Sequence, residues 1–130
     1  YEETLELIEK YGLKDSVEFT NVLSKKEWHK KSKNYDIFIN TTNFDNTPVS
    51  VIEAMALGLP IVSTNVGGVP YLIDDEIDGL LVDKESPIQM ANAILNIINN
   101  DYPDLAFLAR KKAEGFDWNT VKHKWLEVLE

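Results

Sequence analysis

The chain has 130 residues, of which 44% are apolar and 27% charged, and it carries a formal net charge of −9 and no cysteine. This composition predicts one folded domain or part of one, and it excludes a disordered tail, a disulfide framework and a zinc-thiolate site. The negative charge disfavours nucleic acid as a partner, because a phosphate backbone would be repelled, but it does not exclude a small phosphorylated ligand.

Helices and short apolar strands alternate along the sequence. Apolar periodicity, cap residues and continuous apolar runs predict helices over residues 2–11, 25–32 (after a Ser24 cap), 48–57, 87–99, 102–114 and 118–130. The same signals predict strands over residues 17–19, 35–40, 60–64 and 79–82, and a turn over 66–70 that leads into a short helical segment. This alternation predicts a parallel sheet, in which ligands bind where strands end and loops enter helices.

The longest and most polar of these loops covers residues 41–47, so we expect a ligand there. Thr47 is a suitable N-cap for the helix that follows, and Pro48 suits its first position because a missing N–H costs nothing there. The unpaired amides of Val49 and Ser50, together with the helix dipole, can then bind an anion such as a phosphate.

Glu53 lies about one and a half turns inside this helix. Helical side chains lean toward the N-terminus, so its carboxylate can accept hydroxyl hydrogen bonds from the same ligand. An alternative is a capping box, in which Glu53 bonds only the backbone of Ser50, although the phase of Pro48 starts the helix earlier. Asp45 can equally be an ordinary loop aspartate.

The segment 45–68 resembles the signature of the retaining GT-B glycosyltransferases called group 1, or family 4. That signature joins Glu-x7-Glu to Ala-Met-Ala-x-Gly-x-Pro. Here Asp45 precedes Glu53 by eight positions, and residues 54–60 read Ala-Met-Ala-Leu-Gly-Leu-Pro. The flanks at 17–19, 35–40 and 78–82 agree, so the likeness covers essentially the whole chain. Asp45 stands where the family has Glu, and its side chain is shorter by one methylene.

The resemblance implies a nucleotide-diphosphate sugar as substrate, with no cofactor and no required metal. Glu53 would bind the ribose hydroxyls, the amides of Val49 and Ser50 would hold the diphosphate, and Asp45 would be the catalytic residue, in contact with the sugar near its reacting carbon. The other expected donor-binding residues are Asn46, Thr47 and Pro48 in the loop, and Thr20, Asn21 and Val22 near the base.

It further implies an α/β fold: a Rossmann-like parallel sheet with flanking helices, the C-terminal half of the GT-B fold. The first strands of that domain and the acceptor-binding N-terminal domain are expected to be missing from residues 1–130. We therefore expect a partial donor-binding domain that is inactive alone, with a sugar, lipid or glycan acceptor bound through the other domain. The strand order 3-2-1-4-5-6 would leave edges open beside residues 17–19 and 37–39, which predicts a rearranged sheet or self-association.

Three alternatives stay open. A nucleotide-binding or scaffold module without transferase activity fits the same fold. Residues 74–85 nearly match an EF-hand calcium loop and fail where Glu76 replaces Asp or Asn. The lysines between residues 25 and 33 predict a solvated helix face, with contact to an anionic acceptor or membrane as the alternative.

No apolar run approaches the roughly 18 residues of a membrane span. The resemblance leads us to expect a cytoplasmic location, with peripheral attachment to the inner face of a membrane as the second option.

Overall fold

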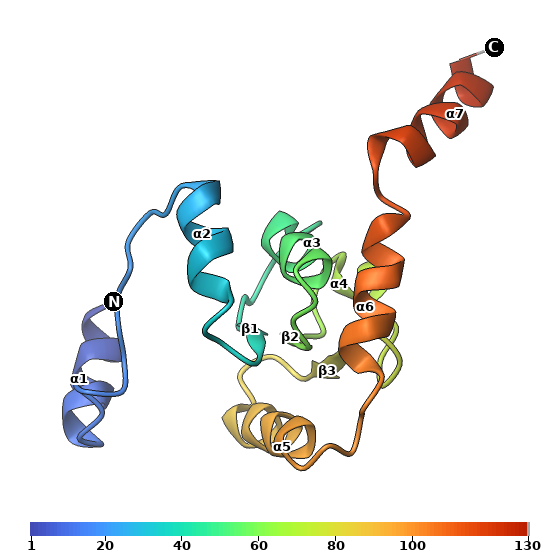
Figure 1. The fold of residues 1–130 in the computed structure, drawn as a ribbon. Helices are drawn as coiled ribbons and strands as arrows, with labels where there is room; N and C mark the ends of the chain where they lie inside the picture. Colours follow the sequence, from blue (N-terminus) through green and yellow to red (C-terminus); the bar gives the residue numbers. More distant parts are fainter. Residues whose placement is uncertain (130) are drawn as a thin grey trace. The chain divides into compact units, whose positions relative to one another are not determined.

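The computed structural model describes residues 1–129, which fall into two compact units, residues 1–31 and the chain from Ser32 onward. Each unit is built mainly from helices, and the second also contains a parallel sheet (Figure 1).

The first unit begins with α1 (Glu2–Lys10). This helix ends as predicted, because Gly12 adopts a φ of +65° and donates its amide to the carbonyl oxygen of Glu9 at 3.1 Å. Ile8 is the buried residue of this helix.

Residues 17–19 do not form the predicted strand. A strand is completed by hydrogen bonds from a neighbouring strand, and no strand within residues 1–129 pairs with this segment. Its side chains are held in other ways. The Phe19 ring meets the Tyr1 ring edge-on at 5.5 Å between centroids, and Glu18 forms an ion pair of 2.6 Å with Lys31.

The cap predicted at Ser24 is confirmed at the start of α2 (Lys25–Ser32). The Glu27 carboxylate accepts hydrogen bonds from the Ser24 hydroxyl at 2.5 Å and the Ser24 amide at 2.9 Å, while the Glu27 amide donates to the Ser24 hydroxyl at 3.3 Å. These bonds form a capping box. They favour the ionised carboxylate and lower the pKa of Glu27.

The second unit is organised around three parallel strands: β1 (Phe38–Asn40), β2 (Ile61–Thr64) and β3 (Leu80–Val82), in the order β1-β2-β3. In this register Ile39 pairs with Val62, and Val62 with Leu80. All four residues of β2 are buried, as expected for a strand covered on both faces. β1 is shorter than predicted and Ile39 is 42% exposed, because β1 lies at the margin of the sheet.

Helices cover the sheet. α3 (Val49–Ala56) and α6 (Leu105–Glu114) contact each other, and both contact β2. On the other side of the sheet, α5 (Pro87–Ile98) packs residues such as Ala93 and Ile97 against Val62 and Leu80 (Figure 1). The predicted parallel α/β arrangement is therefore confirmed.

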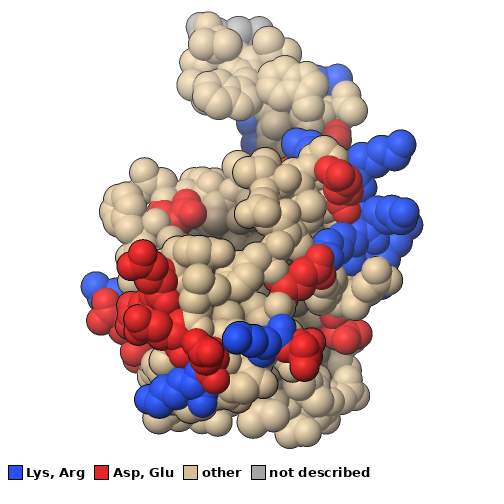
Figure 2. All heavy atoms as spheres, turned by 90° about the vertical axis from the view of Figure 1, so that its left-hand side faces the viewer, with Lys and Arg blue, Asp and Glu red and all other residues tan. Residues whose placement is uncertain are grey.

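Two further helices complete the unit, α4 (Val69–Leu72) and α7 (Trp118–Leu129). α6 starts at Leu105 rather than near residue 102, since Asp104 occupies the N-cap position. α7 has no buried residue within the described part of the chain, and the upper lobe of Figure 2 shows its mostly uncharged side chains at the surface.

The two margins of the sheet differ. On the outer side of β3, the Leu81 amide donates to the Asp75 carboxylate at 2.8 Å, and the next outward amide, that of Asp83, donates to the Gln89 side chain at 2.9 Å. On β1, the Phe38 amide bonds the Pro60 carbonyl of the β2 side, so the backbone groups of Ile39 face outward. Within residues 1–129 no strand covers that margin.

Candidate functional site

The loop between β1 and α3 is fastened to the carboxyl end of β2. The Thr64 hydroxyl donates to the Thr42 carbonyl at 2.5 Å, and the Asn40 amide group donates to the Ser63 hydroxyl at 3.1 Å. The loop predicted as the ligand position therefore lies where two parallel strands end, at the edge where α/β folds bind ligands.

Two glycines after β2 lie in close contact with the backbone of the loop between β1 and α3. The Gly68 amide donates to the Asp45 carbonyl at 2.9 Å. A Cβ placed on Gly68 would lie 1.5 Å from the Asn46 carbonyl oxygen, and one on Gly67 would lie 2.0 Å from that of Asp45. The two backbones can approach this closely only because both positions are glycine.

Residues 66–70 were predicted as a turn that leads into a short helical segment, and their contact with the loop was not predicted. The signal was present, since two consecutive glycines shortly after a buried strand are typical of a place where another backbone approaches closely. What the sequence could not show is that the approaching backbone carries Asp45 and Asn46.

α3 starts one residue later than predicted. Pro48 is its N-cap, with φ −70° and an extended ψ of 103°, and its carbonyl accepts the amides of Val51 at 3.0 Å and Ile52 at 3.3 Å. Thr47 is therefore not the cap and Pro48 is not the first helical residue, because its ψ lies outside the helical region.

The amides at this helix start are nevertheless available, as expected. α3 has no side-chain cap hydrogen bond. Within residues 1–129, the backbone amides of Val49 and Ser50 form no backbone hydrogen bond either. Such amides and the helix dipole form a ready site for an anion. The one-residue shift of the helix leaves both amides at its start, and phosphate binding there stays a prediction.

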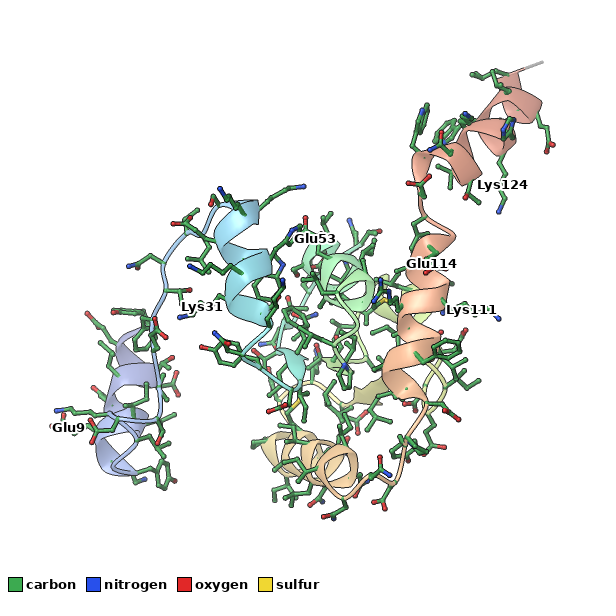
Figure 3. All side chains as sticks on the ribbon, viewed as in Figure 1. Glu9, Lys31, Glu53, Lys111, Glu114 and Lys124 are labelled. Carbon is green, nitrogen blue, oxygen red and sulfur yellow. The ribbon has the colours of Figure 1, made fainter. Side chains whose placement is uncertain are left out.

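The capping-box alternative for Ser50 and Glu53 is wrong. Ser50 is the second residue of α3, so it does not occupy the N-cap position that a capping box requires. The core side of α3 is formed by Val51, Ala54 and Met55, and Glu53 projects from the helix away from that side and away from α6 (Figure 3).

The predicted residues of the loop are brought together in the second unit. Asp45 is partly buried beside the glycine turn, whereas Asn46 and Thr47 are exposed. Thr20, Asn21 and Val22 belong to the first unit, where Val22 is 98% exposed. Their part in the site stays a prediction.

The carboxylates in the EF-hand-like segment bind protein groups. The Lys112 ammonium lies 2.9 Å from Asp74 and 2.8 Å from Asp78, and the Asp78 carboxylate also accepts the Asp74 amide at 2.8 Å. Hydrogen bonding to Lys112 lowers the pKa of Asp74. No group of three or more metal-binding side chains occurs within residues 1–129, so the arrangement is that of a structural turn packed on α6.

The family of this chain is known from its match to a family model. The model of the family described as glycosyl transferases group 1 matches residues 1–115. The chain belongs to this family. Solved structures agree with the assignment of the chain to the GT-B fold. Sucrose-phosphate synthase from Thermosynechococcus elongatus matches with a TM-score of 0.87 at 23% identity, over 98% of this chain and 33% of that one.

Another solved structure and two curated relatives are matched over a similar share of their own length. Anabaena Alr3699/HepE, solved in complex with UDP, matches with a TM-score of 0.87 at 24% identity, over 98% of this chain and 36% of that one. The putative colanic acid biosynthesis glycosyltransferase WcaL of Escherichia coli is 29% identical over 95% of this chain and 33% of its own length. The D-inositol 3-phosphate glycosyltransferase of Paenarthrobacter aurescens is 31% identical over 92% of this chain and 30% of its own length. The chain thus spans about a third of these relatives.

Among the described residues of this group 1 protein, every helix is too short or too polar to cross a bilayer.

Proposed function

We propose that the chain is part of the donor-binding domain of a glycosyltransferase that moves a sugar from a nucleotide-diphosphate sugar to an acceptor with retention. The observation that carries this proposal is the uncapped start of α3, where two amides without a backbone partner follow the loop of Asp45 and precede Glu53 by about one turn. The names of the relatives and the UDP complex of HepE support it.

In this proposal each part of the site has one role. The amides of Val49 and Ser50 hold the diphosphate and stabilise the negative charge that grows on it as it leaves. Glu53 accepts hydrogen bonds from the ribose hydroxyls. Asp45 contacts the sugar close to its anomeric carbon, while Asn46, Thr47 and Pro48 shape the loop around it. The acceptor oxygen then attacks that carbon from the face that the diphosphate leaves.

The domain assignment is part of the proposal. Residues 1–130 would supply most of the donor side, with Thr20, Asn21 and Val22 near the base. The acceptor, a sugar, lipid or glycan, would be bound by another domain of the same protein. On this basis residues 1–130 alone bind a donor without transferring it. The relatives named for colanic acid and amylovoran synthesis favour a role in polysaccharide synthesis.

Replacing Glu53 by Ala in the full-length protein is expected to weaken UDP binding by about 10- to 100-fold, because a hydrogen bond to a charged group contributes about 1.5–3 kcal/mol. Isothermal titration calorimetry with UDP and UDP-glucose measures this change. Glu114→Ala, which removes an exposed glutamate at the end of α6, is the matched control and should bind as the unsubstituted protein does. Equal binding by Glu53→Ala and Glu114→Ala would contradict the ribose assignment.

Replacing Val49 by Pro tests the helix start without breaking the helix. Proline is tolerated at the first helical position, and Pro48 already has the extended ψ that a residue before proline prefers. The substitution removes one amide donor, so we expect UDP affinity to fall about tenfold. Val49 is 62% exposed, so Val49→Ala, which keeps the amide, should bind normally in the same titration. Loss of affinity in both variants would point to the side chain instead.

A second candidate, a nucleotide-binding module without transfer activity, is favoured by one observation, the shorter Asp45 in place of the family Glu. The two candidates agree on UDP binding and differ in turnover. Release of UDP from UDP-glucose or from other nucleotide sugars by the full-length protein, lost in Asp45→Asn, is expected for the transferase.

A further inference from the structure

Phe44 is a large aromatic side chain that stands 78% exposed in the polar loop between β1 and α3. A single exposed apolar residue needs no explanation by itself. Phe44 differs from the other exposed aromatic residues in its position, because it immediately precedes Asp45 at the carboxyl end of β1. No sequence signal had marked it.

The backbone that carries this ring is held on both sides. Before it, the Thr42 hydroxyl donates to the Phe44 carbonyl at 2.9 Å and accepts the Phe44 amide at 3.4 Å. After it, the Asp45 carbonyl accepts the Gly68 amide at 2.9 Å. The Thr42 carbonyl is in turn bonded by the Thr64 hydroxyl of β2. An exposed ring on a fixed backbone loses only its own side-chain rotation when a ligand covers it.

The chemistry at this point fits a sugar ring. A pyranose presents hydroxyl groups around its rim, which suit a carboxylate such as Asp45, and flat patches of C–H groups on its faces, which suit an aromatic ring. Sites of this kind combine an apolar surface with a few well-placed polar groups.

We infer that Phe44 is a sugar platform, whose ring stacks on the C–H face of a sugar held by Asp45. The inference rests on the proposed function and extends it, since it assigns a residue that sets which sugars are accepted. The sugar can be the one carried by the nucleotide or the one that receives it, and both offer the same C–H face.

The test uses the full-length protein with Phe44→Ala, Phe44→Leu and Phe44→Tyr. Titration with UDP and with UDP-glucose gives the donor arm, and titration of the UDP-saturated protein with glucose gives the acceptor arm. We expect Phe44→Ala and Phe44→Leu to bind UDP within twofold of the unsubstituted protein and to weaken UDP-glucose or glucose binding about tenfold. Phe44→Tyr keeps a ring and should restore binding.

Phe107→Ala is the matched control. Phe107 is a 67% exposed phenylalanine on α6, one turn before Arg110, which lies beside Gly58 at the opposite end of α3 from the site. It should leave all three affinities unchanged, and thermal unfolding checks that each variant is folded.

The outcomes separate the two proposals. Normal sugar binding by Phe44→Ala, with UDP binding lost in Glu53→Ala, overturns the platform and leaves the proposed function in place. Equal losses of UDP and UDP-glucose in Phe44→Ala also overturn it, because the ring would then act on the nucleotide or the loop. A full-length protein that binds neither UDP nor any nucleotide sugar overturns both.

Discussion

Lys112→Met is expected to destabilise the protein by about 3–5 kcal/mol, the cost of leaving a buried charge without its partner. The Asp78 side chain is only 5% exposed, and its carboxylate has Lys112 at 2.8 Å and the Asp74 amide at 2.8 Å as partners. Methionine fills similar space but leaves Asp78 with the amide alone. Urea denaturation measures the loss as a lower midpoint.

Two comparisons make this prediction specific. Lys111→Met removes the neighbouring lysine, which projects into solvent from α6, and should change stability by less than about 0.5 kcal/mol (Figure 3). The double variant Lys112→Met with Asp78→Asn removes both charges and should be more stable than Lys112→Met alone. A double variant as unstable as the single one would show that the charge on Asp78 is not the cause.

The same cluster makes stability depend on pH in a defined direction. Lys112 lowers the pKa of Asp74 below its ordinary 3.8, so this contribution is present above that pH and is lost as the pH falls through the folded pKa. Burial lowers the pKa of Lys112, but hydrogen bonds to Asp78 and Asp74 outweigh it and raise that pKa above 10.5. This contribution is complete below pH 10.5 and is lost as the pH rises through the folded pKa. The difference between the unsubstituted protein and Lys112→Met should therefore shrink in acid.

Gly68→Ala is expected to cost about 3 kcal/mol or more, above the usual range for overpacking, and to abolish most donor binding. The φ of −88° at Gly68 suits any residue, so the effect is purely one of space. The new methyl group would lie 1.5 Å from the Asn46 carbonyl oxygen and 2.6 Å from its carbon, both of them backbone atoms that cannot rotate away. The loop that carries Asp45 must then move away from β2.

Gly12→Ala is the converse case and serves as the comparison. Gly12 has a positive φ of +65° but no atom within 4 Å of the place that a new methyl group would occupy, so the substitution should cost only about 1 kcal/mol and leave UDP affinity unchanged. Denaturation and UDP titration of both variants distinguish the two mechanisms. Normal UDP binding by Gly68→Ala would mean that the contact between the glycine turn and the loop does not position the site.

The elements that were predicted well are those whose signals are local. β2, the capped α2 and the end of α3 at Gly58 lie within about one residue of their predicted positions, because apolar runs, capping residues and a glycine at positive φ act over a few neighbours. The segment 17–19 failed for the opposite reason, since strand formation depends on a partner that local pattern does not reveal.

The candidate site shows the same division. Val49, Ser50 and Glu53 could be placed on one helix start from spacing alone, although the choice between Thr47 and Pro48 as N-cap depended on a single ψ angle. The contact of Gly67 and Gly68 with residues 45–46 joins segments more than 20 positions apart, so only the folded chain reveals it. No sequence motif marks Phe44. Its proposed role became apparent only from the hydrogen bonds that hold its loop at the end of the sheet.

The sheet can be extended in one direction only. Asp75 and Gln89 occupy the outward amides of Leu81 and Asp83, so a strand that approached β3 would find its hydrogen-bond donors already taken. Any strand that joins this sheet, from the rest of the protein or from another copy, must do so beside β1. If it is parallel, its carboxyl end comes to the same edge of the sheet as Asp45, and the loop that leaves it lies next to the proposed sugar position. Because the margin at β3 is already hydrogen-bonded, an added strand can contribute residues to the candidate site only from the β1 side.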